Sequence, residues 1–209
     1  MLKNSPVDIE GIYEDYISKK NEKNKLERYV GQEHYYHASS TGSCSRKIYF
    51  ESIDKATPTD LPDNRANRLL RLGTVLHDDI QEPLLQYNVT SNGTLHSNKD
   101  TWSRKFGHKK DPNPSRLHEM QLGTYGIAVK EKFGRLDGMY LCYYKKDDSR
   151  LKSVAVPMAY LGYAESYWKD IKKEHEKGLP MFREGVSPAY PWMCGYCQFK
   201  TLCNPISFK

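Results

Sequence analysis

Three closely spaced cysteines and one distant cysteine place the strongest constraint on how this chain folds. Two residues separate Cys194 from Cys197 and five separate Cys197 from Cys203, so one tight loop can direct three thiols at a single centre. A tetrahedral metal ion or an iron–sulfur cluster needs a fourth ligand. Cys44, about 150 residues earlier, suits this role because a predicted helix begins there, and unpaired backbone amides at a helix start favour a thiolate. Residues 180–209 are therefore predicted to close onto Cys44.

The cysteine spacing leaves three possibilities open, namely an iron–sulfur cluster, a structural zinc ion, or no metal. Zinc sites more often combine two short Cys-x-x-Cys motifs. Here there is one such motif with one further cysteine nearby, and the fourth ligand is distant in sequence. The fifth cysteine, Cys142, lies in an apolar strand and is interpreted as a core residue. An odd number of cysteines in a chain without an apparent export signal argues against disulfides.

The composition excludes a membrane-spanning protein and favours a soluble one. Of 209 residues, 38% are hydrophobic and 28% are charged, and the mean hydropathy is -0.79. No apolar run approaches the roughly 18 residues of a membrane span, and the opening residues lack the apolar stretch of a secretory signal. We expect a single domain over residues 1–209, in the cytoplasm and without a membrane partner. The net charge of +6 permits a polyanionic partner but does not require one.

Apolar periodicity predicts a mixed α/β chain in which residues 1–36 form an N-terminal helical segment begun by Ser5-Pro6. Gly123 and Gly126 count against one of the helices. The stretch between Gln86 and Leu95 has room for one brief hairpin, and the proline-rich segment 180–209 is predicted to be a loop organised by a ligand. The predicted helices are Cys44 to Ile53, Ala66 to Leu84, Leu117 to Val129 and Ala159 to Lys177, and the predicted strands are Met139 to Tyr144 and Val154 to Pro157.

Four separated motifs occur in an order that resembles a known family. They are Ser40-Thr-Gly-Ser-Cys44-Ser-Arg46, Gly73-Thr-Val-Leu-His77, Gln121-Leu-Gly-Thr-Tyr125 and the closing triplet Cys194, Cys197, Cys203. Together, over about Ser39 to Cys203, they resemble the iron–sulfur branch of the PD-(D/E)XK nuclease superfamily, which includes RecB-like and CRISPR-associated exonucleases. The resemblance implies a restriction-endonuclease-like α/β core with a small mixed sheet flanked by helices, and a 4Fe–4S cluster held by Cys44 and the triplet.

The same resemblance implies a metal-dependent DNA exonuclease in recombination, repair or phage DNA processing, in a prokaryotic cell or a phage-infected host. A Mg²⁺ or Mn²⁺ ion would orient the scissile phosphate and lower the pKa of the attacking water. By analogy with the family, His77 would be an additional ligand of this ion. Gln121 and Tyr125 would position the nucleophile or the DNA.

The catalytic acids of the family are the point at which this sequence departs from the pattern. Between the histidine motif and the glutamine motif there is no Asp strand followed by Glu-x-Lys. The nearest match is Ser97-Asn98-Lys99, which keeps a lysine, assigned here as catalytic, but has serine in place of the acid. Gly134 to Asp137 looks like the missing Asp motif but follows the glutamine motif and is interpreted as a turn. Other acids that could approach a metal without restoring the spacing are Asp78, Asp79, Asp100 and Glu119.

A basic cluster next to two aromatic residues is a candidate DNA-binding loop. Phosphate contacts combined with base stacking suit DNA with a single-stranded region, although a solvated surface loop has the same composition. The cluster comprises Arg104, Lys105, His108, Lys109 and Lys110, beside Trp102 and Phe106. Three functions thus remain open: a nuclease, a non-catalytic iron–sulfur DNA-binding or assembly module, and a zinc-stapled structural protein.

Overall fold

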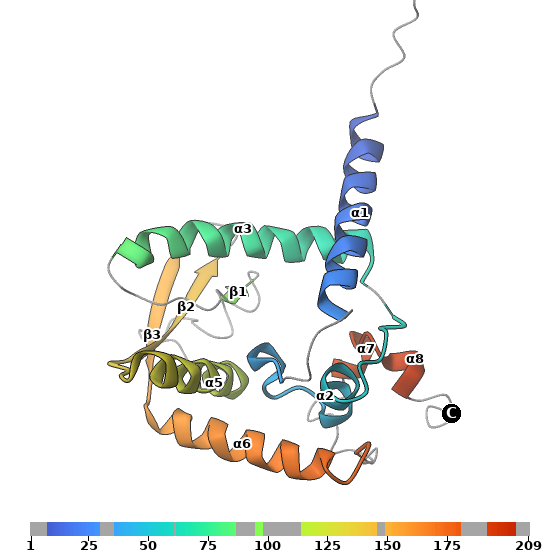
Figure 1. Ribbon diagram of the computed structural model, residues 1–209. Coiled ribbons are helices and arrows are strands. Elements are labelled where there is room, and N and C mark those ends of the chain that lie inside the picture. Colours follow the sequence, from blue (N-terminus) through green and yellow to red (C-terminus); the bar gives the residue numbers. More distant parts are fainter. Residues whose placement is uncertain are drawn as a thin grey trace, which may run out of the picture.

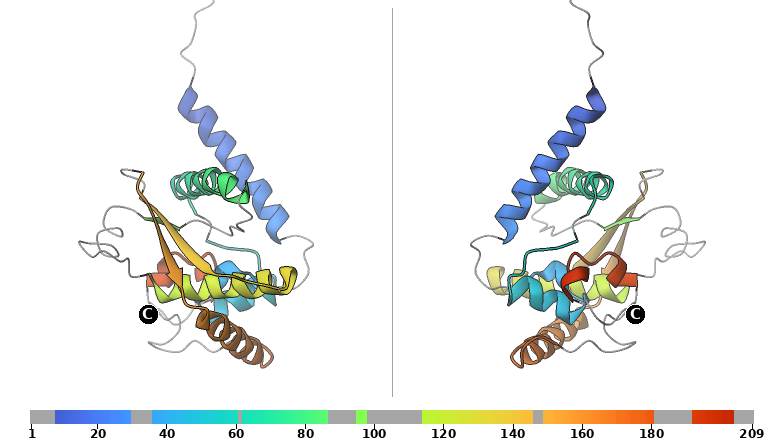
Figure 2. Two further views of the ribbon diagram at one scale, coloured as in Figure 1. Left: turned by 90° about the vertical axis from the view of Figure 1, so that its left-hand side faces the viewer. Right: turned by 90° about the vertical axis from the view of Figure 1, so that its right-hand side faces the viewer.

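Helices flank a small mixed sheet in the computed structural model (Figures 1 and 2). The described residues are 8–29, 36–60, 62–86, 95–97, 114–145, 149–180 and 192–203. Their helices are α1 (Ile9–Tyr29), the 3-10 helix η1 (Ala38–Ser40), α2 (Ser45–Ser52), α3 (Asn64–Gln86), α5 (Arg116–Phe133), α6 (Ala159–His175), α7 (Trp192–Gly195) and α8 (Lys200–Cys203). The strands run between the level of α3 and that of α5 with α6. This arrangement confirms the predicted α/β class and a mixed sheet flanked by helices.

The sheet has the order β1-β2-β3. β1 (Leu95–Ser97) pairs in parallel with β2 (Met139–Lys145), and β2 pairs antiparallel with β3 (Leu151–Val156). A parallel pair requires a crossover connection, and α5 lies in the segment that joins β1 to β2. Both predicted strands are confirmed, with β3 beginning earlier than predicted and ending before Pro157, which has no N–H to donate to the ladder.

The hydrophobic core lies on one face of β2 and β3. Met139, Leu141 and Tyr143 alternate along β2, and all three are buried together with Val156, as a half-buried strand requires. Side chains of α5 and α6 cover this face. The partly buried residues packed against it are Leu122, Leu136, Val154, Tyr160 and Leu161.

Two glycines allow α5 to pack closely against α6 and the sheet. A Cβ atom at Gly123 would lie 2.3 Å from the backbone oxygen of Tyr160, and one at Gly126 would lie 2.7 Å from side-chain atoms of Leu161 and Met139. The sequence interpretation counted these glycines against a helix, but α5 forms. Their lack of a side chain lets α5 lie close to α6 and the sheet. α5 then ends at Gly134, whose φ of 72° is the left-handed geometry of a helix C-cap.

Gly123→Ala is expected to lower the free energy of unfolding by about 2–3 kcal/mol, because the new methyl group meets backbone that can yield only if the helices separate. Gly162→Ala on α6 is the matched control, since a Cβ there meets nothing within 4 Å. This control is expected to stabilise the chain by up to about 1 kcal/mol through helix propensity. Urea unfolding followed by circular dichroism measures both, and equal effects of the two substitutions would contradict the close-packing explanation.

α1 and α3 pack against each other, and the N-terminal end of α1 is capped by a side chain. The backbone N–H of Gly11 donates to the Asp8 carboxylate at 2.8 Å, so Asp8 caps α1, while the predicted cap at Ser5-Pro6 lies outside the described residues. Glu14 forms an ion pair with Arg68 across the two helices. The apolar stripe predicted on α3 leaves four large side chains exposed, namely Leu69, Leu70, Leu72 and Val75. Within the described part of the chain, no helix combines the length and apolar character of a bilayer span.

Candidate functional site

The structure brings Cys44 into the same region as Cys194, Cys197 and Cys203. Burial is the main cause that raises the pKa of Cys194 and of Cys197, and the negative charges of Cys44 and Cys203 raise both further. Arg46, two residues after Cys44, donates through Nε to the Cys203 sulfur at 3.2 Å, which places the start of α2 beside the last cysteine. All four side chains are half-buried, and none of them forms a disulfide. That the C-terminal cysteines close onto Cys44 around a common centre remains a prediction.

The cysteine segment has more local structure than a loop organised by a ligand alone. Cys44 is the N-cap of α2, and the triplet lies on the one-turn helices α7 and α8 and the turn between them. The backbone N–H of Cys197 donates to the oxygen of Cys194 at 3.2 Å, and that of Cys203 donates to the oxygen of Phe199 at 2.7 Å. The backbone N–H of Phe199 donates to the Cys197 sulfur, which offsets part of the rise that burial causes in the pKa of that thiol. This segment therefore corrects the prediction of an irregular loop.

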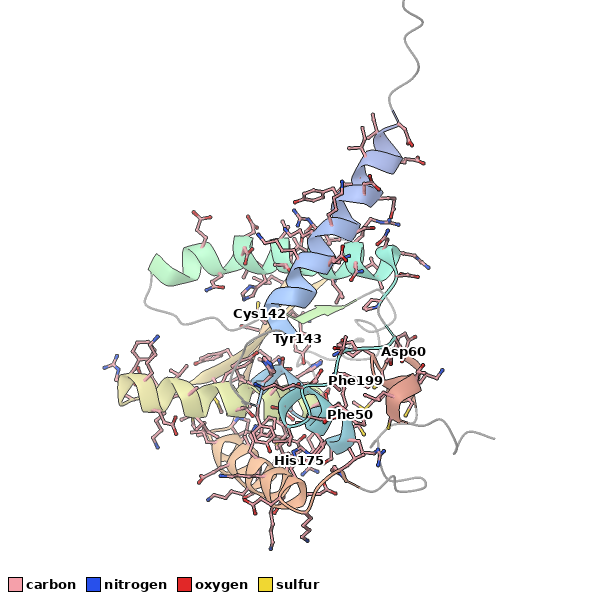
Figure 3. The ribbon with its side chains drawn as sticks, turned by 45° about the vertical axis from the view of Figure 1, so that its right-hand side comes forward. Phe50, Asp60, Cys142, Tyr143, His175 and Phe199 are labelled. Atoms are coloured by element: carbon pink, nitrogen blue, oxygen red, sulfur yellow. The ribbon has the colours of Figure 1, made fainter. Side chains whose placement is uncertain are left out.

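Phe199 anchors the segment by packing beneath α2. Its side chain is 0% exposed, and its ring lies 5.6 Å from that of Phe50, centroid to centroid; the two side chains lie side by side in Figure 3. The neighbouring Gln198 side chain donates to the Glu51 carboxylate at 2.8 Å. An apolar contact and a polar contact thus join α2 to the C-terminal segment independently of any metal.

Asp60, which the sequence interpretation did not select, caps α8 from a distant part of the chain. Its carboxylate accepts hydrogen bonds from the backbone N–H and the hydroxyl of Thr201, both at 2.8 Å. These bonds, with one from Thr59, hold the pKa of Asp60 below its usual value. The backbone N–H groups of Thr59 and Asp60 also donate to the oxygen of Gln198, at 2.9 and 3.0 Å. The segment before α3 therefore fixes the turn that carries Cys197.

Arg46 contacts a cysteine sulfur directly. Its Nε donates to the Sγ of Cys203 at 3.2 Å, and its Nη2 donates to the Cys203 backbone oxygen at 3.2 Å. Its Nη1 donates to the backbone oxygen of Pro180. One guanidinium therefore links α2, the segment after α6, and the last cysteine.

His175 supports the start of α2 from the end of α6 (Figure 3). Its Nε2 lies 3.0 Å from the backbone oxygen of Ser45, and its Nδ1 lies 3.1 Å from the Tyr36 hydroxyl. Burial lowers the pKa of His175 and favours the neutral ring. A neutral ring can donate through Nε2 and accept through Nδ1, which matches both partners. Nothing in the local sequence distinguishes this histidine from any other.

The segment that precedes Cys44 also contacts α5. The hydroxyls of Thr41 and Thr124 lie 3.0 Å apart, and the backbone N–H of Gly42 donates to the Tyr167 hydroxyl at 3.0 Å. Trp168 Nε1 donates to Thr124 Oγ1 at 2.9 Å. Thr124 is the neighbour of Tyr125, so the chain around Cys44 supports the helix that carries the Gln121 and Tyr125 motif.

Cys142 stands apart from the other four cysteines. It lies on β2, away from α7 and α8 (Figure 3), and burial raises its pKa. Its neighbours Leu141 and Tyr143 point into the core, so strand alternation places Cys142 on the other face. It is a half-buried strand residue separate from the thiol group, although the core itself lies on the opposite face.

The four thiols fit a thiophilic centre by their chemistry. Thiolates are soft ligands that favour iron–sulfur clusters and zinc, and Arg46, Lys47 and Lys200 provide positive charge that offsets theirs. Among the described residues, no three His, Cys, Asp or Glu side chains are grouped so that they could hold a single metal ion. A cluster differs from a single ion in this respect, because each thiolate binds a different iron atom.

His77, on α3, is the candidate ligand for a divalent ion. Its Nδ1 lies 3.4 Å from an oxygen of Asp78. Its Nε2 is buried and has no hydrogen-bond partner within the described ranges, which is unusual for a buried polar atom. An atom of this kind fits a ligand role, but the described residues supply no further ligands that complete the set.

Gln121 and Tyr125 lie one turn apart on α5, and both are half-buried. Helical geometry of 3.6 residues per turn places them on a face roughly opposite Gly123, which contacts α6. Within the described part of the chain, no hydrogen bond joins either of them to His77. The other predicted residues of the nuclease site, Lys99, Arg104, Lys105, His108, Lys109 and Lys110, lie outside the described residues.

Comparisons with known proteins give one family match. The crystal structure of SSO0001 is similar to this chain with a TM-score of 0.49 and 16% sequence identity, over 92% of this chain and 98% of that chain. The search of curated proteins found no match. Residues 102–204, which include α5, β2, β3, α6 and the cysteine triplet but neither His77 nor Cys44, match the family model of the PD-(D/E)XK nuclease superfamily.

Proposed function

We propose that this chain is a metal-dependent DNA exonuclease with a structural 4Fe–4S cluster, which acts in the cytoplasm in DNA recombination, repair or phage DNA processing. The observation that carries the proposal is the contact between the start of α2, where Cys44 lies, and the cysteine triplet, since Arg46 Nε donates to Cys203 Sγ at 3.2 Å. The family match over residues 102–204 supports the nuclease part. The proposed substrate is DNA with a single-stranded region.

In this proposal the cluster is a structural cross-link rather than a reaction centre. It would join α2 to α7 and α8, which are distant in sequence. The chain before Cys44 is bonded to Thr124 through Thr41, so the cross-link would also hold α5 in place. This path connects the cysteine region to the helix on which Gln121 and Tyr125 lie.

The residues of the nuclease site have separate roles in this proposal. A bound Mg²⁺ or Mn²⁺ supplies Lewis acidity and a water of lowered pKa. His77 would bind the ion through its unpartnered Nε2, and Lys99 would polarise water or phosphate. Gln121 and Tyr125 would orient the nucleophile or the DNA. The basic residues Arg104, Lys105, Lys109 and Lys110 would contact the phosphate backbone.

A second candidate is a non-catalytic iron–sulfur module that binds DNA or assembles with other proteins. The observation that favours it is Ser97 at the end of β1, next to Asn98-Lys99, where the family has a carboxylate. A metal site without its carboxylates binds a divalent ion weakly. The two candidates share the cluster and differ in cleavage.

The test begins with anaerobic purification, a visible spectrum, and an assay of iron, sulfide and zinc. The expected result is iron and sulfide near four per chain, as for a four-cysteine cubane. Cleavage of end-labelled single-stranded and duplex DNA is then measured with Mg²⁺, with Mn²⁺ and with chelator. His77→Ala and Lys99→Ala are each expected to reduce cleavage by about 100-fold, by comparison with the loss when metal-site groups are removed.

Lys130→Ala, an exposed lysine on α5, is the control for Lys99→Ala and is expected to cleave normally. Zinc in place of iron would support the zinc-stapled structural protein and overturn the cluster. Iron without cleavage in any divalent metal would support the non-catalytic module. Undiminished cleavage in both site variants would show that His77 and Lys99 are wrongly assigned.

A further inference from the structure

The Arg46 side chain donates a hydrogen bond to a cysteine sulfur. Its Nε lies 3.2 Å from Cys203 Sγ, a normal distance for a hydrogen bond to the large sulfur atom. We propose that Arg46 sets the reduction potential of the cluster by donating this hydrogen bond to a ligand sulfur, a role that rests on the iron–sulfur centre proposed above.

The geometry of Arg46 fixes the donor in place. Its Nη2 donates to the Cys203 backbone oxygen at 3.2 Å, and its Nη1 donates to the Pro180 oxygen. Because the guanidinium is planar, these two carbonyl contacts determine where Nε points. The side chain is half-buried at the second position of α2, two residues after Cys44. The donor is therefore held against the sulfur rather than sampling many orientations.

The charge of Arg46 is directed at the thiol group. Within the described residues, no carboxylate forms an ion pair with Arg46, whereas its neighbour Lys47 lies 3.5 Å from Glu51. Hydrogen bonds in which one partner is charged are shorter and stronger than neutral ones. Among the cations near the cysteines, Arg46 therefore combines an uncompensated charge with direct contact to sulfur.

These contacts have a defined effect on an iron–sulfur cluster. One-electron reduction adds negative charge that is shared with the ligand sulfurs. A donor and a positive charge at one sulfur stabilise the reduced form more than the oxidised form, and hydrogen bonds to sulfur together with net charge set the potential. Arg46 is thus expected to raise the reduction potential.

The experiment compares Arg46→Gln and Arg46→Lys with the wild-type chain under anaerobic conditions. Iron and sulfide are assayed first, and the cluster is then titrated with dithionite and redox dyes while its visible absorption is followed. In Arg46→Gln the ratio of reduced to oxidised cluster is expected to fall about tenfold at a given ambient potential, which is about 59 mV for one electron. Arg46→Lys keeps the charge but loses the planar fork, so its ratio is expected to fall about threefold by the same relation.

Arg135→Gln is the matched control, because it removes the same charge from a side chain that is 81% exposed just beyond α5. Its potential is expected to equal that of the wild type. A potential unchanged in Arg46→Gln, with iron and sulfide at wild-type levels, would overturn the role of Arg46 and leave the cluster in place. If Arg46→Gln does not retain the cluster, an unchanged potential in Arg46→Lys overturns the proposal instead. A wild-type chain without iron would refute the proposed centre itself, which the metal assay detects before any titration.

Discussion

Cys197→Ser is expected to lower the free energy of unfolding by about 5 kcal/mol and to abolish the visible absorption of the cluster. The cluster would cross-link Cys44 to the triplet and close a loop of about 150 residues, for which chain entropy gives a stabilisation of this size. Without the Cys197 thiolate the cluster does not form, so no cross-link closes this loop in the unfolded chain. Guanidinium unfolding under anaerobic conditions, followed by circular dichroism, measures the difference.

Cys142→Ser separates loss of the cross-link from loss of a thiol. Cys142 is also half-buried, and burial raises its pKa, but it lies on β2 outside the thiol group. Replacing its thiol by a hydroxyl is expected to lower the free energy of unfolding by about 1 kcal/mol and to leave the iron content unchanged. Wild-type protein stripped of metal should unfold like Cys197→Ser. Equal stability of the two serine variants would mean that the four thiols do not act as a cross-link.

The spacing of the cysteines predicts that the C-terminal segment closes onto Cys44, but it carries no information about the contacts that hold the segment in place. A Cys-x-x-Cys hook with one further cysteine requires a partner, and Cys44 at a helix start was the best available. The contacts of Asp60 with Thr201, however, join residues 141 positions apart, and a carboxylate in a linker carries no periodic signal. Arg46 and His175 were likewise missed as supporting residues, because their partners, which are backbone oxygens, a sulfur atom and the Tyr36 hydroxyl, are distant in sequence and come near only on folding.

The secondary structure shows where local signals and tertiary packing disagree. The run of strand-forming residues from Met139 to Tyr144, bounded by a charged turn, predicted β2. The two glycines of α5 have low helix propensity, yet Gly123 contacts the backbone of α6, so close packing outweighs propensity there. The parallel partner β1 has only three residues and pairs across a whole helix. No local pattern of that length can specify such a partner.

Phe199→Ala is expected to destabilise the chain by about 3–5 kcal/mol, the usual cost of removing a buried phenylalanine ring. The side chain is 0% exposed, and its ring packs against Phe50 at 5.6 Å. The cavity would lie between α2 and the turn that carries Cys197. We therefore expect faster loss of iron to a chelator as well as a lower midpoint of guanidinium unfolding.

Leu202→Ala in the same segment is the matched control, since this leucine is 42% exposed. It is expected to change the free energy of unfolding by less than about 0.5 kcal/mol, as surface substitutions usually do. The comparison separates apolar anchoring from the proposed cross-link, because both variants keep all four thiols. If Phe199→Ala were as stable as Leu202→Ala, the ring would contribute nothing beyond what the metal centre supplies. A loss confined to the metal-free chain would mean instead that the cluster alone can hold the segment in place.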